Sequence, residues 1–462
     1  MVNCEETTPL SKGTKTKIIE IVDKRLLKQI PNCPHGQCAQ IAQSAGKLGL
    51  KDSSLVQWIV KNSSADLANY SIEEIYMLIH GAEKLFSKSA LHSLIKHYET
   101  LLIKDPRELK QLEDLKPNGI ACLLKACART QKRGFLSVKL FEMAIKQLDK
   151  FSLQEKIDLI AGLYLFGGSD HQTVLKMLRQ IEASVLMSQP SQKTIVAAFV
   201  HFSYCLFLPE MLLPQVKKIL ENSEVTPSIK NRLFYTFATL NLGDDPTIQK
   251  QFATFFNDQV FQLDDNALID LLRTAAILLS EQSPPPLLRA IVDHLMQRHR
   301  GSSNSLKNLP FGLTALHYFE EAAQVAQLLP KETITISEGQ QIVTKAVQEF
   351  FKKHPLLKKL NVISEGEIHG HSVDILITGF DALQIKQEPI AIEIDGPNHF
   401  LFNFPHKIAG KNILREKTLK GACELIIVDL REGCKAAEAK LSAYFLDRCQ
   451  LWKKEFFSAK PQ

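Results

Sequence analysis

The chain has 462 residues, of which 45% are hydrophobic and 23% are charged, so it can bury a core and does not have the composition of a disordered protein. Its 21 glycines and 20 prolines exclude collagenous and low-complexity proteins. The mean hydropathy of -0.07, without an apolar run of about 18 residues, predicts no membrane-spanning helix, and the net charge of +6 suits an anionic partner such as nucleic acid.

The cysteines and the N-terminal segment bear on the compartment. The nine cysteines include no Cys-x-x-Cys pair, so the sequence predicts neither disulfides nor a zinc ribbon. Residues 1–36 are expected to contain a helix, lack a secretory apolar region and carry glutamates that argue against a transit peptide. We therefore expect a cytoplasmic protein by default, with an organelle or a host cell as alternative destinations.

Residues 37–329 are predicted to form a series of paired helices. Amphipathic segments recur at intervals of about 33–45 residues, and a second helical segment follows each of them. Capping residues mark several starts, as in the run Ser152-Leu-Gln-Glu155. The first helices of the pairs are expected to begin near Gln37, Ser71, Lys116, Ser152, Ser191, Pro227, Leu263 and Asn308.

A helical hairpin repeated at this period is typical of an α-solenoid, in which each pair is stable only against its neighbours. The period exceeds that of tetratricopeptide repeats and approaches that of HEAT or armadillo repeats. Such an array presents a long concave surface that suits an extended polymer. Single-stranded nucleic acid and a protein segment are both consistent with this pattern.

From about residue 331 the pattern changes to strands mixed with helices. Strands are predicted at 362–367, 372–378, 390–395 and 425–429, and helices at 338–354, 407–420 and 436–453. This αβββαβα order indicates a small separate α/β domain.

The strongest local signal lies in the strand at residues 390–395. Glu393 and Asp395 fall on one face of this strand because side chains alternate with a period of two. Asp374 occurs in the preceding strand, so we expect three carboxylates to converge. Such a group requires a cation, a basic side chain or a shared proton. The helix that follows supplies basic side chains that either pair with these acids or face phosphate, namely Lys411, Arg415 and Lys420.

The run Ala391-Ile-Glu-Ile-Asp-Gly-Pro-Asn-His-Phe400, followed by Leu414-Arg-Glu-Lys-Thr-Leu-Lys420-Gly421 and the apolar strand 425–428, resembles a RAP domain, which we place at residues 338–455. Such domains are RNA-associated and similar in fold to restriction endonuclease-like nucleases of the PD-(D/E)XK type. With the preceding repeats, the layout resembles octotricopeptide-repeat RNA-binding proteins and FAST-kinase-like proteins. The resemblance implies an RNA-binding protein that affects RNA processing, stability or translation.

The resemblance also implies site residues. Asp374 matches the nuclease aspartate and Glu393 the acid of the (D/E)xK strand. Asp395 stands where that motif has lysine, a role that Lys411 or Lys420 would then take. A nuclease of this kind would use Asp374, Glu393 and Asp395 to hold Mg²⁺. The implied contacts with nucleic acid come from a histidine and from the basic helix, namely His399, Lys407, Lys411, Arg415 and Lys420.

Other basic and histidine residues carry weaker predictions. Lys352 and Lys353 open the densest basic run of the chain, which is either a solvated helix end or a phosphate-facing patch. His399 is equally consistent with a structural role. Three further histidines are conceivable helpers, although the first two fit a solvent-exposed hairpin tip better: His369, His371 and His406.

Three functions follow from the sequence. The first is a non-catalytic module that binds single-stranded RNA, in which the acids pair with Arg415 or Lys411 inside a nuclease-like fold. The second is a Mg²⁺-dependent endoribonuclease, and the third is an α-solenoid scaffold that binds another protein. The residue set of protein kinases is absent, so no kinase activity is expected.

Overall fold

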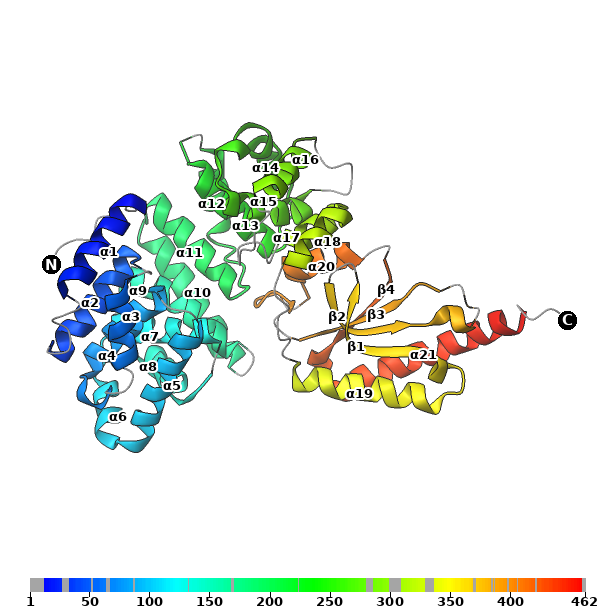
Figure 1. The fold of residues 1–462 in the computed structure, drawn as a ribbon, viewed down its shortest axis with the longest axis horizontal. Helices are drawn as coiled ribbons and strands as arrows, with labels where there is room; N and C mark the ends of the chain where they lie inside the picture. The colour runs from blue at the N-terminus through cyan, green and yellow to red at the C-terminus, as the bar shows by residue number, and fades with distance from the viewer. Residues whose placement is uncertain are drawn as a thin grey trace. The chain divides into compact units, whose positions relative to one another are not determined.

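The computed structural model describes residues 12–458 apart from 27–32, 51–52, 64–66, 86–87, 132, 168–169, 223, 280–285, 299–308, 329–335, 369–370, 384, 386, 397–398, 405 and 420–421. The chain forms two compact units, Met1–Cys205 and Leu206–Gln462. It is mostly helical, with one four-stranded sheet near the C-terminus (Figure 1). In the described part of the chain, every helix is too short or too polar to cross a bilayer.

The first unit consists of helices. They are α1 (Lys12–Leu26), α2 (His35–Leu48), α3 (Ser54–Ser63), α4 (Ile72–Leu85), α5 (Lys88–Lys104), α6 (Pro106–Glu113), α7 (Pro117–Thr130), α8 (Phe135–Gln147), α9 (Leu153–Leu163), α10 (His171–Met187) and α11 (Gln192–Tyr204). The first helices of successive pairs stack in the order α2, α4, α7, α9, α11. This unit is therefore a solenoid-like stack of helical hairpins.

The second unit continues with paired helices. They are α12 (Leu213–Glu221), α13 (Pro227–Thr239), α14 (Pro246–Asp258), α15 (Asp265–Leu278), α16 (Pro286–Arg298), α17 (Leu309–Ala315) and α18 (Phe319–Leu328). Here α13, α15 and α17 stack in sequence. In both units every predicted first helix begins within two residues of the expected position. Ser152 and Ser191 cap their helices, because their side chains accept the backbone N–H of Glu155 and of Thr194, respectively.

The C-terminal part has the predicted order of elements. It comprises α19 (Glu338–Lys353), β1 (Asn361–Ile368), β2 (His371–Thr378), β3 (Ile390–Asp395), α20 (Gly410–Leu419), β4 (Glu424–Asp429) and α21 (Cys434–Ser458). The strands lie in the order β1-β2-β3-β4. The pairs β1–β2 and β2–β3 are antiparallel, whereas β3 and β4 are parallel and connected through α20. A small α/β fold thus follows the helical region.

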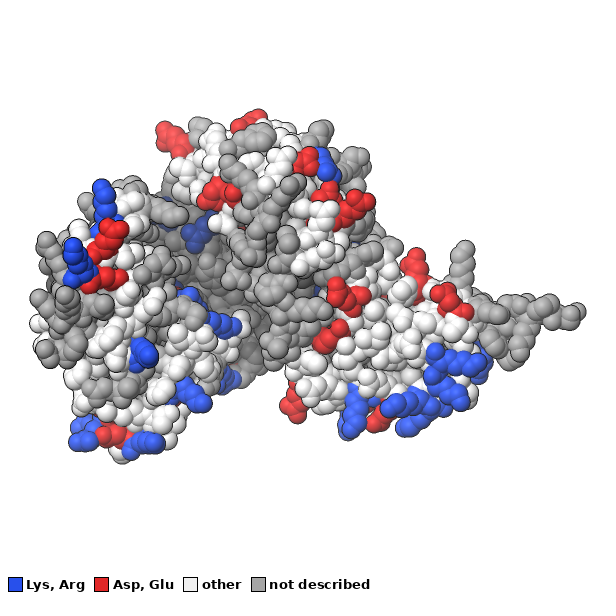
Figure 2. Space-filling model, viewed as in Figure 1, with Lys and Arg blue, Asp and Glu red and all other residues white. Residues whose placement is uncertain are grey.

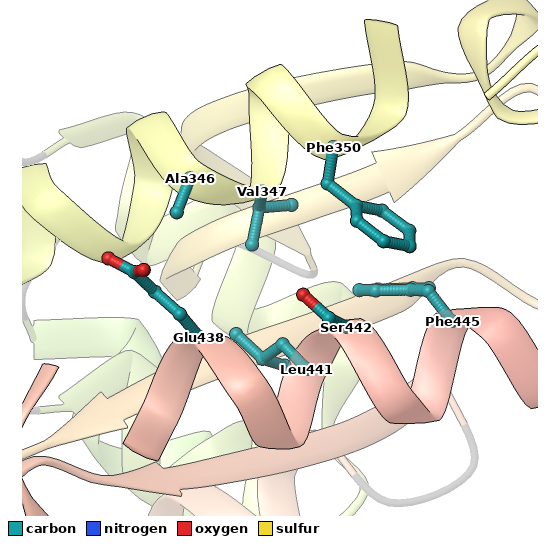
Figure 3. A pocket seen from close by; sticks show the side chains of 7 residues that line it. All are labelled: Ala346, Val347, Phe350, Glu438, Leu441, Ser442 and Phe445. Atoms are coloured by element: carbon teal, nitrogen blue, oxygen red, sulfur yellow. The ribbon is translucent and has the colours of Figure 1, made fainter. Parts of the chain in front are cut away.

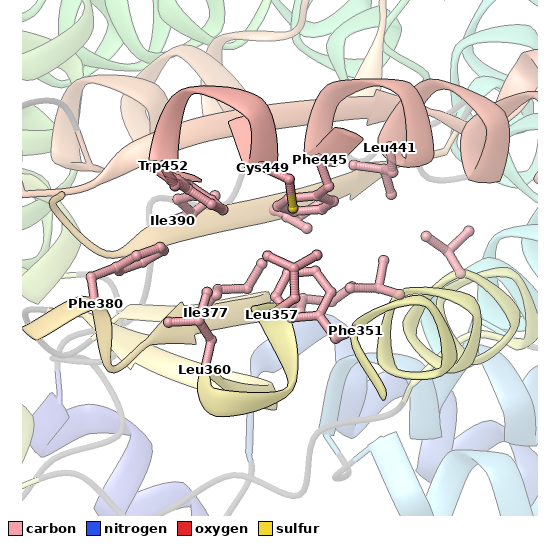
Figure 4. Close-up of a cluster of buried hydrophobic side chains, with 14 of the residues drawn as sticks. Phe351, Leu357, Leu360, Ile377, Phe380, Ile390, Leu441, Phe445, Cys449 and Trp452 are labelled. Atoms are coloured by element: carbon pink, nitrogen blue, oxygen red, sulfur yellow. The ribbon is translucent and has the colours of Figure 1, made fainter. Parts of the chain in front are cut away.

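The main core of this α/β part lies between the sheet and the helix pair α19 and α21 (Figure 4). Ile390, Ile392 and Ile394 of β3 join it, together with Phe351 of α19 and Trp452 of α21. Ala391 belongs to a second, smaller core on the opposite face of the sheet. Because side chains alternate along β3, Glu393 and Asp395 also lie on this second face.

Helix α20 covers the second face and packs on the helical region with its other side. It contacts α13, α15 and α17, so the α/β part and the paired helices of residues 206–329 share one compact unit. Lys417 of α20 donates to the carbonyl oxygens of Ala276, Ile277 and Leu279 at 3.0, 3.4 and 3.3 Å, at the C-terminal end of α15. The boundary that we expected between residues 329 and 338 is therefore not the division between the two compact units.

Candidate functional site

The three predicted carboxylates come together at the ends of two neighbouring strands. The β2–β3 ladder pairs Ile375 with Ile392 and goes no further toward Asp374. Beyond that point the Asp374 side chain, and not a backbone carbonyl of β2, accepts the N–H of Ile394, with a distance of 2.6 Å to Oδ2. Asp374 therefore lies next to Glu393, and Asp395 follows on the same strand face.

Arg415 of α20 joins the two acids of β3. Its guanidinium lies 3.0 Å from Glu393 Oε2 and 2.6 Å from Asp395 Oδ1. His399 Nδ1 lies 2.7 Å from the same Asp395 oxygen. Both acids are almost inaccessible, with 3% of Glu393 and 1% of Asp395 exposed. Arg415 therefore supplies the basic partner that such acids require.

The protonation states follow from burial and from Arg415. Burial raises the pKa of Glu393 to about 8, an effect that the Arg415 charge only partly offsets. Burial also raises the pKa of Asp374, although the hydrogen bonds from Ile394 and Gln340 act in the opposite direction. Burial opposes ionisation of Asp395 as well, but contact with His399 and the charge of Arg415 outweigh it and lower the pKa of Asp395. At neutral pH the site thus holds an Asp395–Arg415 ion pair beside a protonated Glu393.

The hydrogen bonding of this site is incomplete. Among the described residues around Arg415, these buried atoms have no well-aligned hydrogen-bond partner: Glu393 Oε1, Asp395 Oδ2, Arg415 Nε and Glu416 Oε1. The Glu393 and Asp374 carboxyl groups are within hydrogen-bond reach of each other. Buried polar atoms are usually satisfied, so their grouping around one guanidinium distinguishes this region from an ordinary core.

The predicted magnesium set does not fit an open metal site. Arg415 takes one oxygen each of Glu393 and Asp395, and both oxygens of Asp374 accept hydrogen bonds, from Ile394 and from Gln340. In the described ranges, no group of three or more His, Cys, Asp or Glu side chains is placed to hold a metal ion. For Glu393 and Asp395 the arrangement instead matches the other interpretation, in which the acids pair with Arg415.

The remaining predicted cations do not join the acids within the described residues. Lys407 is partly buried in the loop before α20, and His406 beside it is exposed. Lys411 lies in the first turn of α20, but its side chain is outside the description, as is that of His371. Two predicted residues, Lys420 and His369, fall entirely outside the described residues.

Two residues of the site were missed by sequence reasoning. Gln340 caps α19 together with Ser337 and also donates to Asp374 Oδ1. The Ser-x-x-Gln spacing reveals the cap, but nothing local indicates the contact with Asp374. Arg431 follows β4, where Asp429 lies opposite Asp395 in the parallel register, and its guanidinium stacks 3.5 Å from the ring centroid of Phe400.

Exposed lysines occur in the middle and at the C-terminal end of α19 and in the turn that follows. Figure 2 shows basic side chains grouped over this part of the α/β fold. Lys345, Lys352, Lys353 and Lys358 are exposed, and none of them forms an ion pair with another described residue. We call these four residues the α19 basic cluster.

A second basic surface lies in the first unit, on one face of α5. A hollow there is lined by Leu67, Ala68 and Leu101 and by polar residues of α5, namely Ser93, Lys96, His97, Thr100 and Lys104. These α5 residues recur at helical spacing, so they form one continuous stripe. The hollow therefore combines apolar side chains with cations and hydroxyl groups.

A small pocket between α19 and α21 has a different character (Figure 3). Val347 and Phe350 of α19 face Leu441 and Phe445 of α21 across it. Its lining is mostly apolar, so it belongs to the packing between these two helices.

Comparison with models of known protein families and with curated proteins finds no match to this chain.

Proposed function

We propose that this protein binds single-stranded RNA through basic surfaces of its helical repeats and of its C-terminal α/β part, and that the α/β part is a RAP-type, restriction endonuclease-like domain without catalytic activity. The observation that carries this proposal is a contrast between two kinds of charged residue. Of the acids that a nuclease would use, Glu393 and Asp395 are buried and bonded to Arg415 and Asp374 accepts bonds from Ile394 and Gln340, whereas the lysines of the α19 basic cluster are exposed and unpaired among the described residues.

Electrostatics supports a polyanionic partner. Unpaired lysines attract phosphate without first losing an intramolecular partner, and binding releases counterions from the nucleic acid. The α5 stripe offers further cations and hydroxyl groups next to apolar side chains. A nucleotide chain is complementary to this combination, because its phosphates bind cations and its bases pack on apolar side chains. The net charge of +6 has the same sign as these surfaces.

Salt-dependent RNA binding tests this proposal. A variant with Lys352, Lys353 and Lys358 changed to Ala should bind single-stranded RNA more weakly. Its slope of log affinity against log salt should fall by about 2, because each lost phosphate contact contributes about 0.7 for a single strand. Fluorescence anisotropy over a salt series measures this slope.

A control variant removes the same charge from paired lysines. Lys116, Lys125 and Lys139 lie 3.4, 3.5 and 3.0 Å from Glu73, Asp158 and Glu142, so changing them to Ala should leave the slope near that of the wild type. Equal slopes for both triple variants would refute the role of the α19 basic cluster. Failure of the wild type to bind RNA at low salt would favour the protein scaffold instead.

One observation favours the endoribonuclease as a second candidate. Glu393 Oε1 and Asp395 Oδ2 are buried without a partner, side by side on one strand face. Cleavage of RNA that requires Mg²⁺ and disappears in both Asp374→Ala and Glu393→Ala would select this candidate. Binding without cleavage in any divalent metal would retire it.

A further inference from the structure

A cysteine and a histidine lie in contact on two stacked helices of the first unit, away from the carboxylate site. His80 of α4 places Nδ1 2.5 Å from Sγ of Cys122 on α7. Both side chains are partly exposed, so solvent and small molecules reach them. A thiol in contact with an imidazole is the arrangement that activates nucleophilic cysteines, because the imidazole takes the thiol proton.

Polar neighbours hold these two helices in register at the pair. One turn before His80 on α4 lies Tyr76, whose hydroxyl accepts from Asn118 at 2.9 Å and from Gln43 of α2 at 3.4 Å. Asn118 itself lies one turn before Cys122. The two helices therefore make two side-chain contacts one turn apart: Tyr76 with Asn118, and His80 with Cys122.

Tyr76 and Glu155 are ionisable neighbours of the pair among the described residues. Burial raises the pKa of Tyr76, and negative charge on Cys122 and, more weakly, on Glu155 of α9 adds to this shift. Two charged side chains on α7 that the structure describes are engaged with other residues: Arg129 lies 3.8 Å from Glu83, and Lys125 lies 3.5 Å from Asp158. His80 is in direct contact with the sulfur and is thus placed to exchange a proton with it.

We propose that Cys122 is a peroxide-reactive thiol activated by His80. The proton of Sγ moves to His80 Nδ1, which leaves a thiolate beside an imidazolium. The thiolate attacks one oxygen of a hydroperoxide, the S–O bond forms, the O–O bond breaks, and the leaving hydroxide takes the proton of the imidazolium and becomes water. The sulfur is oxidised by two electrons to sulfenic acid, and hydrogen peroxide is reduced to water.

The other described cysteines provide a contrast. Burial raises the pKa of Cys127, on the same helix, to about 12, and that of Cys423 to about 11. Cys434 is partly exposed, as Cys122 is, yet its sulfur has no histidine contact among the described residues. Cys434 is therefore the matched control for exposure, and Cys127 reports whether the first unit stays folded.

The test is the rate at which each cysteine of the full-length protein forms sulfenic acid in dilute hydrogen peroxide, trapped with dimedone and read by peptide mass spectrometry. An ordinary thiol is only about 3% thiolate at pH 7, so we expect Cys122 to react about tenfold faster than Cys434. In His80→Gln the rate at Cys122 should fall to that of Cys434. A Cys122 rate no higher than that of Cys434, or one unchanged in His80→Gln, would overturn the proposal.

If the His80→Gln variant fails to fold, Cys127 becomes labelled. A second measurement, made on the wild type alone, then tests the proposal. Alkylation by iodoacetamide at an ordinary thiol rises roughly tenfold per pH unit between pH 6 and 8. At Cys122 the rate should change less than threefold over this range, because the thiolate is already formed. A tenfold rise per unit at Cys122 would contradict a thiolate–imidazolium pair.

Discussion

At the scale of single residues, Arg415 determines what the acidic site is. Two buried carboxylates on one strand face repel each other and lose their hydration, so they persist only with a partner of opposite charge. Arg415 bonds to both, and the pKa of Asp395 falls while burial raises that of Glu393 to about 8. The site is thus an ion pair next to a neutral acid, which is a stable arrangement without a metal ion.

Removing the guanidinium should be costly. Arg415→Met leaves the Asp395 charge buried without its partner, so we expect the free energy of unfolding to fall by about 3–5 kcal/mol. Urea unfolding measures this loss. Arg289, which is half exposed and pairs with Asp293 at 2.9 Å and with Glu321 at 2.7 Å, provides the control, and Arg289→Met should cost much less than Arg415→Met because its ion pairs are exposed to water. Similar costs for the two variants would contradict the buried ion pair.

The raised pKa of Glu393 predicts a pH dependence. Its value rises from 4.5 to about 8 on folding, so the stability that protonation contributes is complete below about pH 4.5 and is lost as the pH rises through about 8. Glu393→Gln cannot ionise. Between pH 5 and pH 8 its free energy of unfolding should therefore gain roughly 2–4 kcal/mol relative to the wild type.

Urea unfolding at several pH values checks this difference. Glu349→Gln is the matched control for the substitution itself, because Glu349 is exposed on α19 and lies outside the carboxylate site. A constant difference for Glu393→Gln across the same range would show that Glu393 ionises normally in the folded protein.

At the scale of elements, α20 determines how the α/β part joins the helical region. One side of the helix carries Arg415 toward the sheet, and Lys417 reaches the carbonyl oxygens at the end of α15. The loop before α20 adds direct bonds, since Asn241 donates to the carbonyl of Ile408 at 2.9 Å and Asn403 donates to that of Leu208 at 2.8 Å. The helix is thus fixed on both sides.

The start of α20 allows only glycine. A Cβ atom on Gly410 would lie 1.7 Å from the carbonyl oxygen of Ala238 in α13, so Gly410→Ala should force the two helices apart and lower the free energy of unfolding by about 2–3 kcal/mol. Gly396 lies in the segment between β3 and α20, and no atom lies within 4 Å of a Cβ built there. Gly396→Ala should therefore change the free energy of unfolding by less than about 1 kcal/mol. Thermal unfolding of both variants compares them, and equal midpoints would contradict the close approach.

At the scale of the whole molecule, the compact units do not coincide with the change from helices to strands. The unit Leu206–Gln462 contains both paired helices and the sheet, joined through α20. Each first helix in a stack also covers its neighbour, as expected of repeats that bury their apolar faces only against one another.

This division predicts the behaviour of fragments. Residues 206–462 alone should unfold in one cooperative transition, because the contacts of α20 with α13, α15 and α17 are retained. Residues 336–462 alone lose the partners of Lys417, Asn403 and the N–H of Phe402, and should therefore melt at a lower temperature. Calorimetry of the two fragments measures both midpoints. A shorter fragment as stable as the longer one would show that the helical region contributes nothing to the α/β part.

The sequence alone determined the local features of this protein. Helix starts, the order αβββαβα and the shared face of Glu393 and Asp395 depend on periodicity and capping, which are properties of short segments. Tertiary structure decided that Arg415 reaches the acids of β3 and that Gln340 bonds to Asp374. It also decided that α20 is enclosed and that His80 meets Cys122, because both depend on how segments distant in the sequence pack together.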